Sequence, residues 1–209
     1  KKISNYITKK VADKLDEIFK NDRKGFEEKW ESLGLFVKYG MMTEDKFLEK
    51  GKNFLILEDV DGKFETLDEY KAATGNQVNK DGKHVVLYTT NPVQHDAYIQ
   101  QALAKSYKVV KMETMVDNAF INTMEMKWND VVFTRVDADI ADNLIDKTET
   151  SESVLSKEET EKVKELFKHD YEGLNVNVDI KGLSPEAAPV TATRPEQMRR
   201  MKDMASMGG

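Results

Sequence analysis

The residues whose type and spacing most suggest a binding chemistry are four methionines near the end of the chain. They recur at every third position, as Met198, Met201, Met204 and Met207. Unbranched, polarizable side chains suit a surface that accepts partners of many shapes. On a helix each step of three residues turns the position by about 60°, so the first three methionines share a face and Met207 lies opposite Met198. Periodicity alone equally favours a helix buried against its own domain.

A second candidate site is the Thr89-Thr90-Asn91 corner, which follows a predicted strand of a parallel sheet. Ligands of open α/β sheets bind at such strand ends, so the corner could serve a small ligand-binding enzyme. Every β-α-β unit has such a corner, however, and a simple turn is its more common role. Because no nucleophile, metal-ligand set or phosphate loop accompanies it, the enzyme hypothesis is the weaker one.

The other reactive residue types form no catalytic or metal-binding pattern. His84, His95 and His169 lack the short spacing of helix-borne metal ligands, so we expect structural or surface roles for them. Asp137 and Asp139 could act as acid and base, but solvated carboxylates are the usual content of an acidic segment. The sequence has neither glycine-rich phosphate-binding pattern, so we expect no ATP binding by this chain. Without cysteine it has no disulfide and no thiolate zinc site.

The composition excludes several classes of protein. The net charge of the 209 residues is −6, so nucleic acid is not an expected partner. The longest apolar run, Phe54 to Leu57, is far below the roughly 20 residues that cross a bilayer, so we expect no membrane insertion. The absence of cysteine fits a reducing cytoplasm best. The chain opens on Lys1-Lys2 with no apolar leader, so we expect a piece cut from a longer protein.

The first third of the chain is predicted to be mostly helical. Apolar residues recur at helical spacing from Ile3 to Phe19, which predicts a long amphipathic helix. We expect a second helix to begin after Asn21-Asp22 and to end at Gly34. A short helical stretch follows from Thr43, and another helix begins at Thr66, where a glutamate three residues later completes a capping-box pattern.

The middle third combines buried strands with helices. Residues 84–90 and 108–112 are rich in β-branched side chains and are predicted strands, with a helix over residues 98–103 between them. Such a β-α-β unit places its two strands parallel to each other. A further helix over residues 116–124 and a strand over residues 131–136 complete a small sandwich.

The last third begins with an acidic segment that contains few large apolar residues. We expect a helix around residues 163–167, a short strand over residues 175–180 and a capped helix that begins at Thr193-Arg194-Pro195-Glu196. Altogether the sequence predicts an α/β fold, α+β overall, in four parts. These are helices over residues 1–75, an αβα sandwich with the β-α-β unit over 76–146, an acidic linker over 147–156, and a partial α+β domain with an amphipathic helix over 157–209.

Three stretches together resemble the bacterial HtpG branch of the heat-shock protein 90 family. Residues 1–11 (KKISNYITKKV) and 26–40 (FEEKWESLGLFVKYG) are similar to the helical connector of that family's middle domain. The segments TLDEY, LYTT and MVDN, which begin at Thr66, Leu87 and Met115, are similar to its small sandwich. Residues 191–207 resemble an amphipathic helix early in its C-terminal domain. The resemblance covers nearly the whole chain in order.

The resemblance implies a fragment of an ATP-dependent chaperone that lacks the nucleotide-binding domain. In this family ATP and magnesium bind in that other domain, so we expect no catalytic, cofactor or metal residue here. The parent protein is implied to be a homodimer, whose dimerisation helices would follow Gly209. The implied setting is cytoplasmic protein folding during the stress response.

What the resemblance leaves to this chain is contact with non-native client proteins and coupling between domains. Met201 and Met204 match the family's exposed helix positions, and Met198 lies on the same face. On the sandwich the family often has an aromatic residue after an acidic pair; Ala119 stands there, so Phe120 is the nearest candidate. The alternatives are the ligand-binding enzyme at the Thr89–Asn91 corner and a rigid spacer with no binding of its own.

Overall fold

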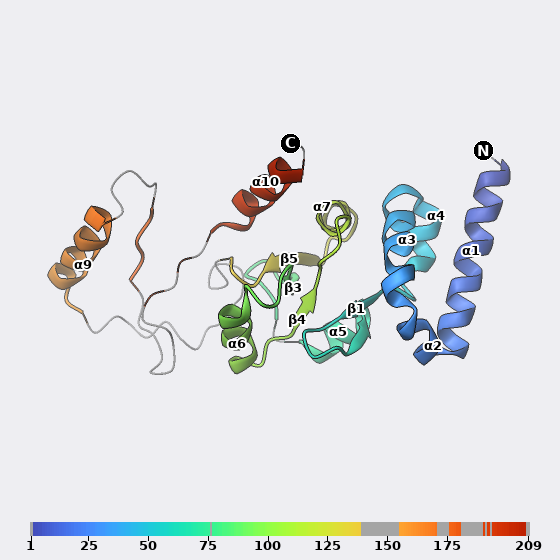
Figure 1. Ribbon diagram of the computed structural model, residues 1–209, viewed down its shortest axis with the longest axis horizontal. Coiled ribbons are helices and arrows are strands. Elements are labelled where there is room, and N and C mark those ends of the chain that lie inside the picture. Colours follow the sequence, from blue (N-terminus) through green and yellow to red (C-terminus); the bar gives the residue numbers. More distant parts are fainter. Residues whose placement is uncertain are drawn as a thin grey trace. The chain divides into compact units, whose positions relative to one another are not determined.

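Figure 1 shows the computed structural model, which describes residues 2–75, 77–138, 155–170, 176–180, 190, 192 and 194–207. The chain divides into two units. The first contains Lys1–Ile145 and Thr193–Gly209, and the second contains Asp146–Ala192. Within the described ranges, no helix combines the length and the apolar character that a membrane crossing requires.

Four helices form the N-terminal part of the first unit: α1 (Lys2–Asn21), α2 (Arg23–Glu28), α3 (Trp30–Thr43) and α4 (Asp45–Gly51). The expected cap at Asp22 is confirmed, since its carboxylate accepts a hydrogen bond from the Gly25 amide at 2.9 Å. The expected end of a helix at Gly34 is wrong. The helix is interrupted at Lys29 instead, and α3 continues through Gly34. A Cβ at Gly34 would lie only 3.1 Å from the Trp30 ring. Glycine at this position lets the indole pack against the helix.

A short antiparallel hairpin and one helix connect these helices to the sandwich. Strands β1 (Ile56–Glu58) and β2 (Phe64–Thr66) were not expected from the sequence, and α5 (Leu67–Ala73) follows directly. The capping box of α5 is confirmed: the Thr66 hydroxyl accepts from the Glu69 amide, and the Glu69 carboxylate accepts from the Thr66 amide.

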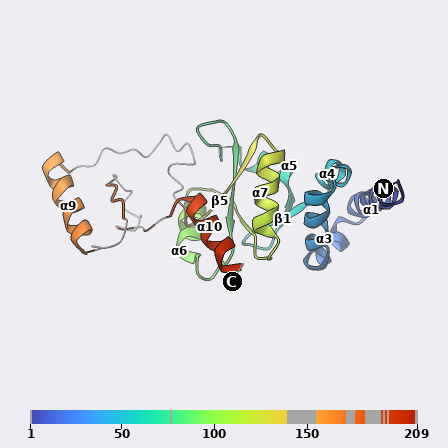
Figure 2. The ribbon, with the colours of Figure 1, turned by 90° about the horizontal axis from the view of Figure 1, so that it is seen from above.

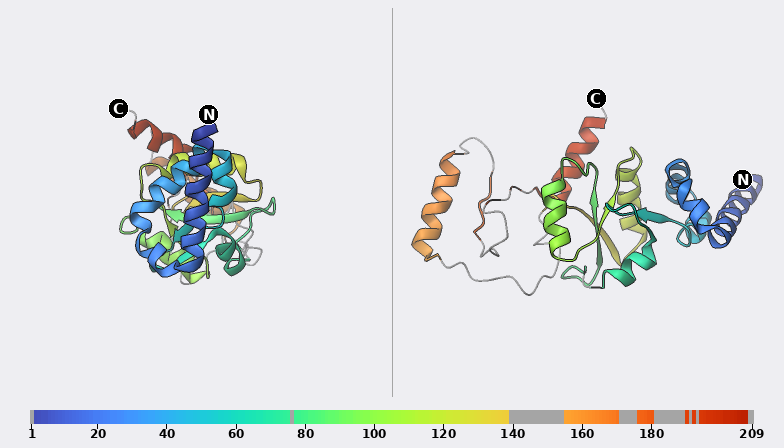
Figure 3. Two further views of the ribbon diagram at one scale, coloured as in Figure 1. Left: turned by 90° about the vertical axis from the view of Figure 1, so that its right-hand side faces the viewer. Right: turned by 60° about the horizontal axis from the view of Figure 1, so that its bottom comes forward.

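The sandwich is built on a three-stranded parallel sheet, in the order β4 (Val109–Lys111), β3 (His84–Thr89) and β5 (Val131–Arg135). The predicted β-α-β unit is therefore confirmed. Helices α6 (Asp96–Ala104) and α7 (Asp117–Lys127) lie on opposite faces of the sheet (Figures 2 and 3). Along β3 the buried side chains alternate between two cores, with Val85 in the core beside α6 and Val86 in the core beside α7.

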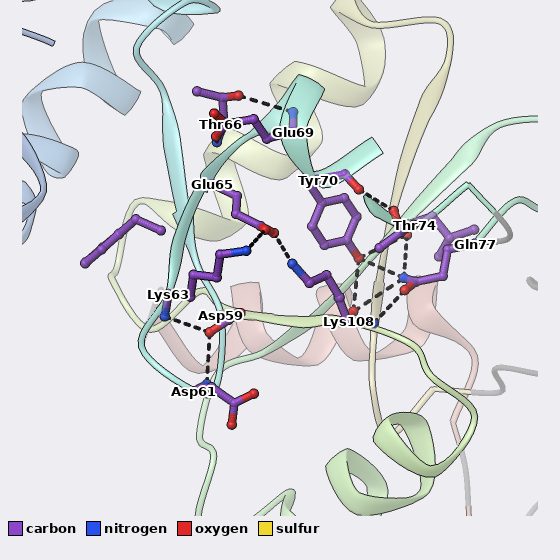
Figure 4. A network of polar contacts seen from close by, with 12 residues as sticks. Asp59, Asp61, Lys63, Glu65, Thr66, Glu69, Tyr70, Thr74, Gln77 and Lys108 are labelled. Carbon is purple, nitrogen blue, oxygen red and sulfur yellow. Dashed lines mark hydrogen bonds and ion pairs between the residues drawn. The ribbon is translucent and has the colours of Figure 1, made fainter. Parts of the chain in front are cut away.

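A buried polar network joins α5 to the sheet (Figure 4). The Tyr70 hydroxyl donates to the Lys108 carbonyl at 3.0 Å and accepts from the Gln77 amide side chain at 2.8 Å. The Gln77 side-chain oxygen in turn accepts from the Lys108 amide at 2.6 Å. Burial raises the pKa of Tyr70 well above its ordinary value, so the phenol keeps its proton and stays a donor.

In the second unit the described residues form helix α9 (Lys157–Asp170) and, over residues 176–180, a stretch with no regular secondary structure. Ser156 and Glu159 cap α9 reciprocally, through the Ser156 amide at 2.8 Å and the Glu159 amide at 3.3 Å. The strand expected over residues 175–180 is wrong for residues 176–180, which pair with no strand in the described part of the chain; residue 175 lies outside it. The acidic linker over residues 147–156 is described only from residue 155.

Helix α10 (Glu196–Met207) belongs to the first unit, where it lies beside β5 (Figure 2). The sequence analysis places this helix in one partial domain with residues 157–192. Local patterns could not reveal its contacts with the sandwich, because the contacting residues lie 60 or more positions apart in the chain. The division over residues 157–209 otherwise stays a prediction.

Candidate functional site

The candidate site is α10 together with the part of the sandwich on which it lies. Glu196, the first residue of the helix, accepts a hydrogen bond from the Tyr88 hydroxyl at 2.8 Å and one from the Arg135 amide at 3.0 Å. The sequence pattern had given Glu196 the role of a capping-box glutamate for Thr193, which lies outside the described residues. That role stays a prediction. The Glu196 carboxylate also fixes the start of the helix to the ends of β3 and β5. Burial and the nearby Glu196 charge raise the pKa of Tyr88.

Arg199 makes the first ionic contact between α10 and the sandwich. Its guanidinium pairs with the Asp137 carboxylate and also donates to the Asp137 carbonyl at 2.5 Å. Arg135 holds the second oxygen of the same carboxylate at 2.8 Å. Only 7% of Arg199 is exposed, and this burial lowers its pKa, while the Asp137 charge opposes the decrease. A guanidinium stays charged even so, and both charges of the pair are compensated.

Arg200 makes the second ionic contact, with α7 and β5. It donates to both carboxylate oxygens of Glu125, at 2.5 and 3.0 Å, to the Asn122 side chain at 3.1 Å and to the Phe133 carbonyl at 2.8 Å. Glu196, one turn earlier, accepts from it at 2.9 Å. Burial alone would lower the pKa of Arg200, but its hydrogen bonds to Glu125 raise it above the ordinary value. The fork geometry of these bonds fixes direction as well as position.

The two methionines of α10 whose side chains the structure describes are largely exposed. Met198 is 62% exposed and Met201 is 61% exposed, as a contact surface requires. Met204 is part of the same helix, but its side chain lies outside those that the structure describes. A binding role for these three residues stays a prediction.

A hollow of about 400 Å³ runs between α10 and the neighbouring α7 and β5. It is lined by a mixture of polar and apolar side chains: Asn122, Glu125, Val132, Phe133, Thr134, Glu196, Gln197, Arg200 and Met201. Met201 therefore stands at the edge of this hollow as well as on the outer face of the helix.

Phe120 does not lie on the surface, which corrects the candidate chosen from the sequence. Its side chain is 0% exposed, its ring packs edge-on against Trp128 with centroids 6.2 Å apart, and the Lys38 ammonium lies 6.0 Å from the ring. The exposed apolar residues of the sandwich near α7 are instead Met115 and Met126, at 75% and 76%. The sequence contained a signal for Met126, because it falls off the stripe of apolar residues that faces the core.

The Thr89–Asn91 corner is a closed turn. The Thr89 side chain is fully buried, and its hydroxyl bonds to His95 Nδ1 at 2.8 Å and accepts from the Asn91 amide at 3.2 Å. His95 Nε2 lies 3.6 Å from Asp137, so this histidine supports the sheet end that also receives Arg199. Among the residues placed in the structure, no three His, Asp or Glu side chains gather closely enough to hold a metal ion.

Comparisons with known proteins find similar sequences of one name and a similar fold. No family model matches the chain. The curated relatives from Bacteroides thetaiotaomicron and Porphyromonas gingivalis, both named chaperone protein HtpG, are 43% identical over 99% of this chain. The chain spans 31% of the length of each. A solved middle domain of a Plasmodium falciparum heat shock protein matches with a TM-score of 0.50 at 14% identity, covering 64% of this chain and 55% of that one. This last match supports the fold alone.

Proposed function

We propose that this chain, which fits a fragment of an HtpG chaperone of the heat-shock protein 90 family, binds non-native client proteins through the outer face of α10. The observation that carries the proposal is the exposure of Met198 and Met201 beside the buried Arg199. Exposed methionines of a surface helix gain most from contact with apolar groups of another protein. The curated relatives, whose name is chaperone, support a partner of this kind.

We propose that the sandwich adds a second apolar contact through the exposed Met126, in place of Phe120. Arg200 joins α10 to Glu125, which is the neighbour of Met126 in α7. A surface of flexible, unbranched side chains from two helices suits partners without a fixed sequence, because it can adapt to many shapes at little strain.

The test compares the binding of an unfolded model protein by the chain and by a Met198→Ser/Met201→Ser variant. Full burial of a methionine contributes roughly 1.5–3 kcal/mol, so partial burial of two should weaken binding by about tenfold when they are removed. Ala205→Ser, at an exposed position of the same helix, is the matched control and should bind as the parent does. Circular dichroism must show the same fold in all three proteins.

Equal affinity of the parent and the methionine variant would contradict the proposed function. If the parent chain itself binds no unfolded protein, the alternative of a rigid spacer between other domains is favoured instead.

The chain is proposed to act without nucleotide chemistry of its own. In the longer parent protein ATP and magnesium would bind in another domain, dimerisation would use other helices, and the cytoplasm would be the site of action. The measurement is a titration of this chain with ATP and magnesium, followed by an assay for released phosphate. Saturable binding or hydrolysis would contradict this part of the proposal.

A further inference from the structure

Helix α10 contacts the sandwich through its charged side chains, whereas an ordinary surface helix uses its apolar face. A surface helix usually turns its apolar stripe toward the core and its charges toward water. In α10 the described side chains that bond to the sandwich are Glu196, Arg199 and Arg200, while Met198 and Met201 are mostly exposed, with Met201 also at the edge of the hollow. The orientation follows from the surface on which the helix lies, since that surface offers carboxylates and carbonyl oxygens.

We propose that Arg199 and Arg200 form a charged dock that holds α10 in one orientation and so keeps Met198 and Met201 exposed. The proposal rests on the proposed function for its biological meaning, but the dock itself can be tested separately. Two arginines, one on each side of the helix contact, bind two carboxylates from different elements, Asp137 after β5 and Glu125 in α7.

Two anchors define an orientation that one anchor would leave free. The Asp137 contact is buried on both sides, with side chains 8% and 10% exposed, and the Glu125 contact is nearly so, at 14% and 21%. Rotation of the helix that brought Met198 inward would take the Arg200 guanidinium from Glu125 and one of two guanidinium partners, Arg199, from Asp137. A buried charge that loses a partner is unfavourable, so the pairs select a single docked orientation.

The charged dock is also what keeps α10 helical. The helix has only 12 residues, and an isolated helix of this length is marginal in water. Loss of the dock should therefore release α10 from the sandwich and reduce its helicity at the same time, without opening the sheet.

Spin labels can measure the dock directly, because the chain has no cysteine of its own. Ala119→Cys in α7 and Ala205→Cys in α10 place one label on each helix at exposed positions. Pulsed electron paramagnetic resonance should give one narrow distance distribution for the docked chain. With Arg199→Gln and Arg200→Gln together, this single distance should be lost in favour of a broad distribution.

Two further variants make the comparison specific. Lys202→Gln removes a positive charge from an exposed position of the same helix and should leave the distance unchanged. Glu125→Gln weakens the dock from the α7 side and should broaden the distribution even if the double arginine variant fails to fold. Circular dichroism and thermal unfolding establish that the sheet is intact in each variant.

A narrow distance retained in both the double arginine variant and Glu125→Gln would overturn the charged dock, as would a broad distribution in the parent. Equal broadening in Lys202→Gln would also overturn it, because the effect would then reflect overall charge. The distances do not depend on client binding. Failure of the proposed function, seen as unchanged binding in Met198→Ser/Met201→Ser, is therefore distinguishable from failure of the dock.

Discussion

Replacing Lys38 with methionine should destabilise the chain more than any change to a surface charge, because Lys38 joins α3 to the sandwich through a buried ion pair. Its ammonium lies 2.6 Å from the Asp117 carboxylate at the start of α7, and the two side chains are only 8% and 3% exposed. The second oxygen of Asp117 accepts from the Thr114 amide at 2.9 Å. After the replacement the Asp117 carboxylate stays buried, with its hydrogen bond from the Thr114 amide but without the ammonium.

The expected cost is about 3–5 kcal/mol, the usual consequence of removing one partner from a buried pair. The surviving bond from Thr114 places the estimate toward the lower end. With a urea dependence of about 1–3 kcal/mol per M, a loss of about 3 kcal/mol moves the unfolding midpoint down by roughly 1–3 M. Adding Asp117→Asn to Lys38→Met should recover more than half of the loss, because the amide oxygen can still accept from Thr114 and no unpaired charge remains.

The chain supplies its own probes and its own control for this experiment. Its two tryptophans, Trp30 in α3 and Trp128 after α7, report separately on the N-terminal helices and on the sandwich. Lys127 and Asp45 also join α7 to these helices, at 2.7 Å, but Asp45 is 87% exposed. Lys127→Met should therefore cost less than about 1 kcal/mol.

A loss in Lys38→Met no larger than that in Lys127→Met would refute the reasoning that burial makes the first pair matter. The reasoning would also be refuted if Lys38→Met with Asp117→Asn were less stable than Lys38→Met alone. Removal of the Asp117 charge should restore stability, because no buried charge then lacks its partner.

Three other outcomes are expected. Tyr70→Phe should lower the free energy of unfolding by about 1–3 kcal/mol in urea, because its buried hydroxyl network loses its centre. Hydrogen bonds from Arg23 lower the pKa of Glu69 from 4.5 to about 2, so this stabilisation is complete above pH 4.5 and is lost as the pH falls through 2. Because the pair is partly exposed, it should contribute less than about 1 kcal/mol to the free energy of unfolding. The midpoint of thermal unfolding of Glu69→Gln should accordingly fall slightly less than that of the parent as the pH falls below 4.5. Limited proteolysis should cut first between Thr148 and Ser156, in the predicted acidic linker; cleavage inside the sheet before that segment would contradict the domain boundaries.

Local patterns were sufficient where a structural element is specified by its own residues. The apolar spacing of α1, the β-branched run of β3 and the capping box at Thr66 all predicted the observed elements. They failed where an element depends on contacts that its own residues do not reveal. Strands β1 and β2 have three residues each, too few for a recognisable alternation, and are fixed by pairing with each other. Gly34 continues α3, with the Trp30 ring packed close to where a Cβ would lie.

The candidate surface shows the same division between local and distant causes. The period of α7 places residues 120, 121 and 124 on one buried stripe, so the burial of Phe120 could have been deduced from its own helix, as could the exposure of Met126. The orientation of α10 could not, because the period of its methionines is equally compatible with a buried and with an exposed face. The surface on which the helix lies decides between the two. Here the surface carries Glu125 and Asp137, which lie 75 and 62 residues from their arginine partners in the sequence. The parallel sheet and α7 bring these two carboxylates together, and the carboxylates bind the arginine face of α10. The exposure of Met198 and Met201 is therefore a consequence of how the sandwich folds.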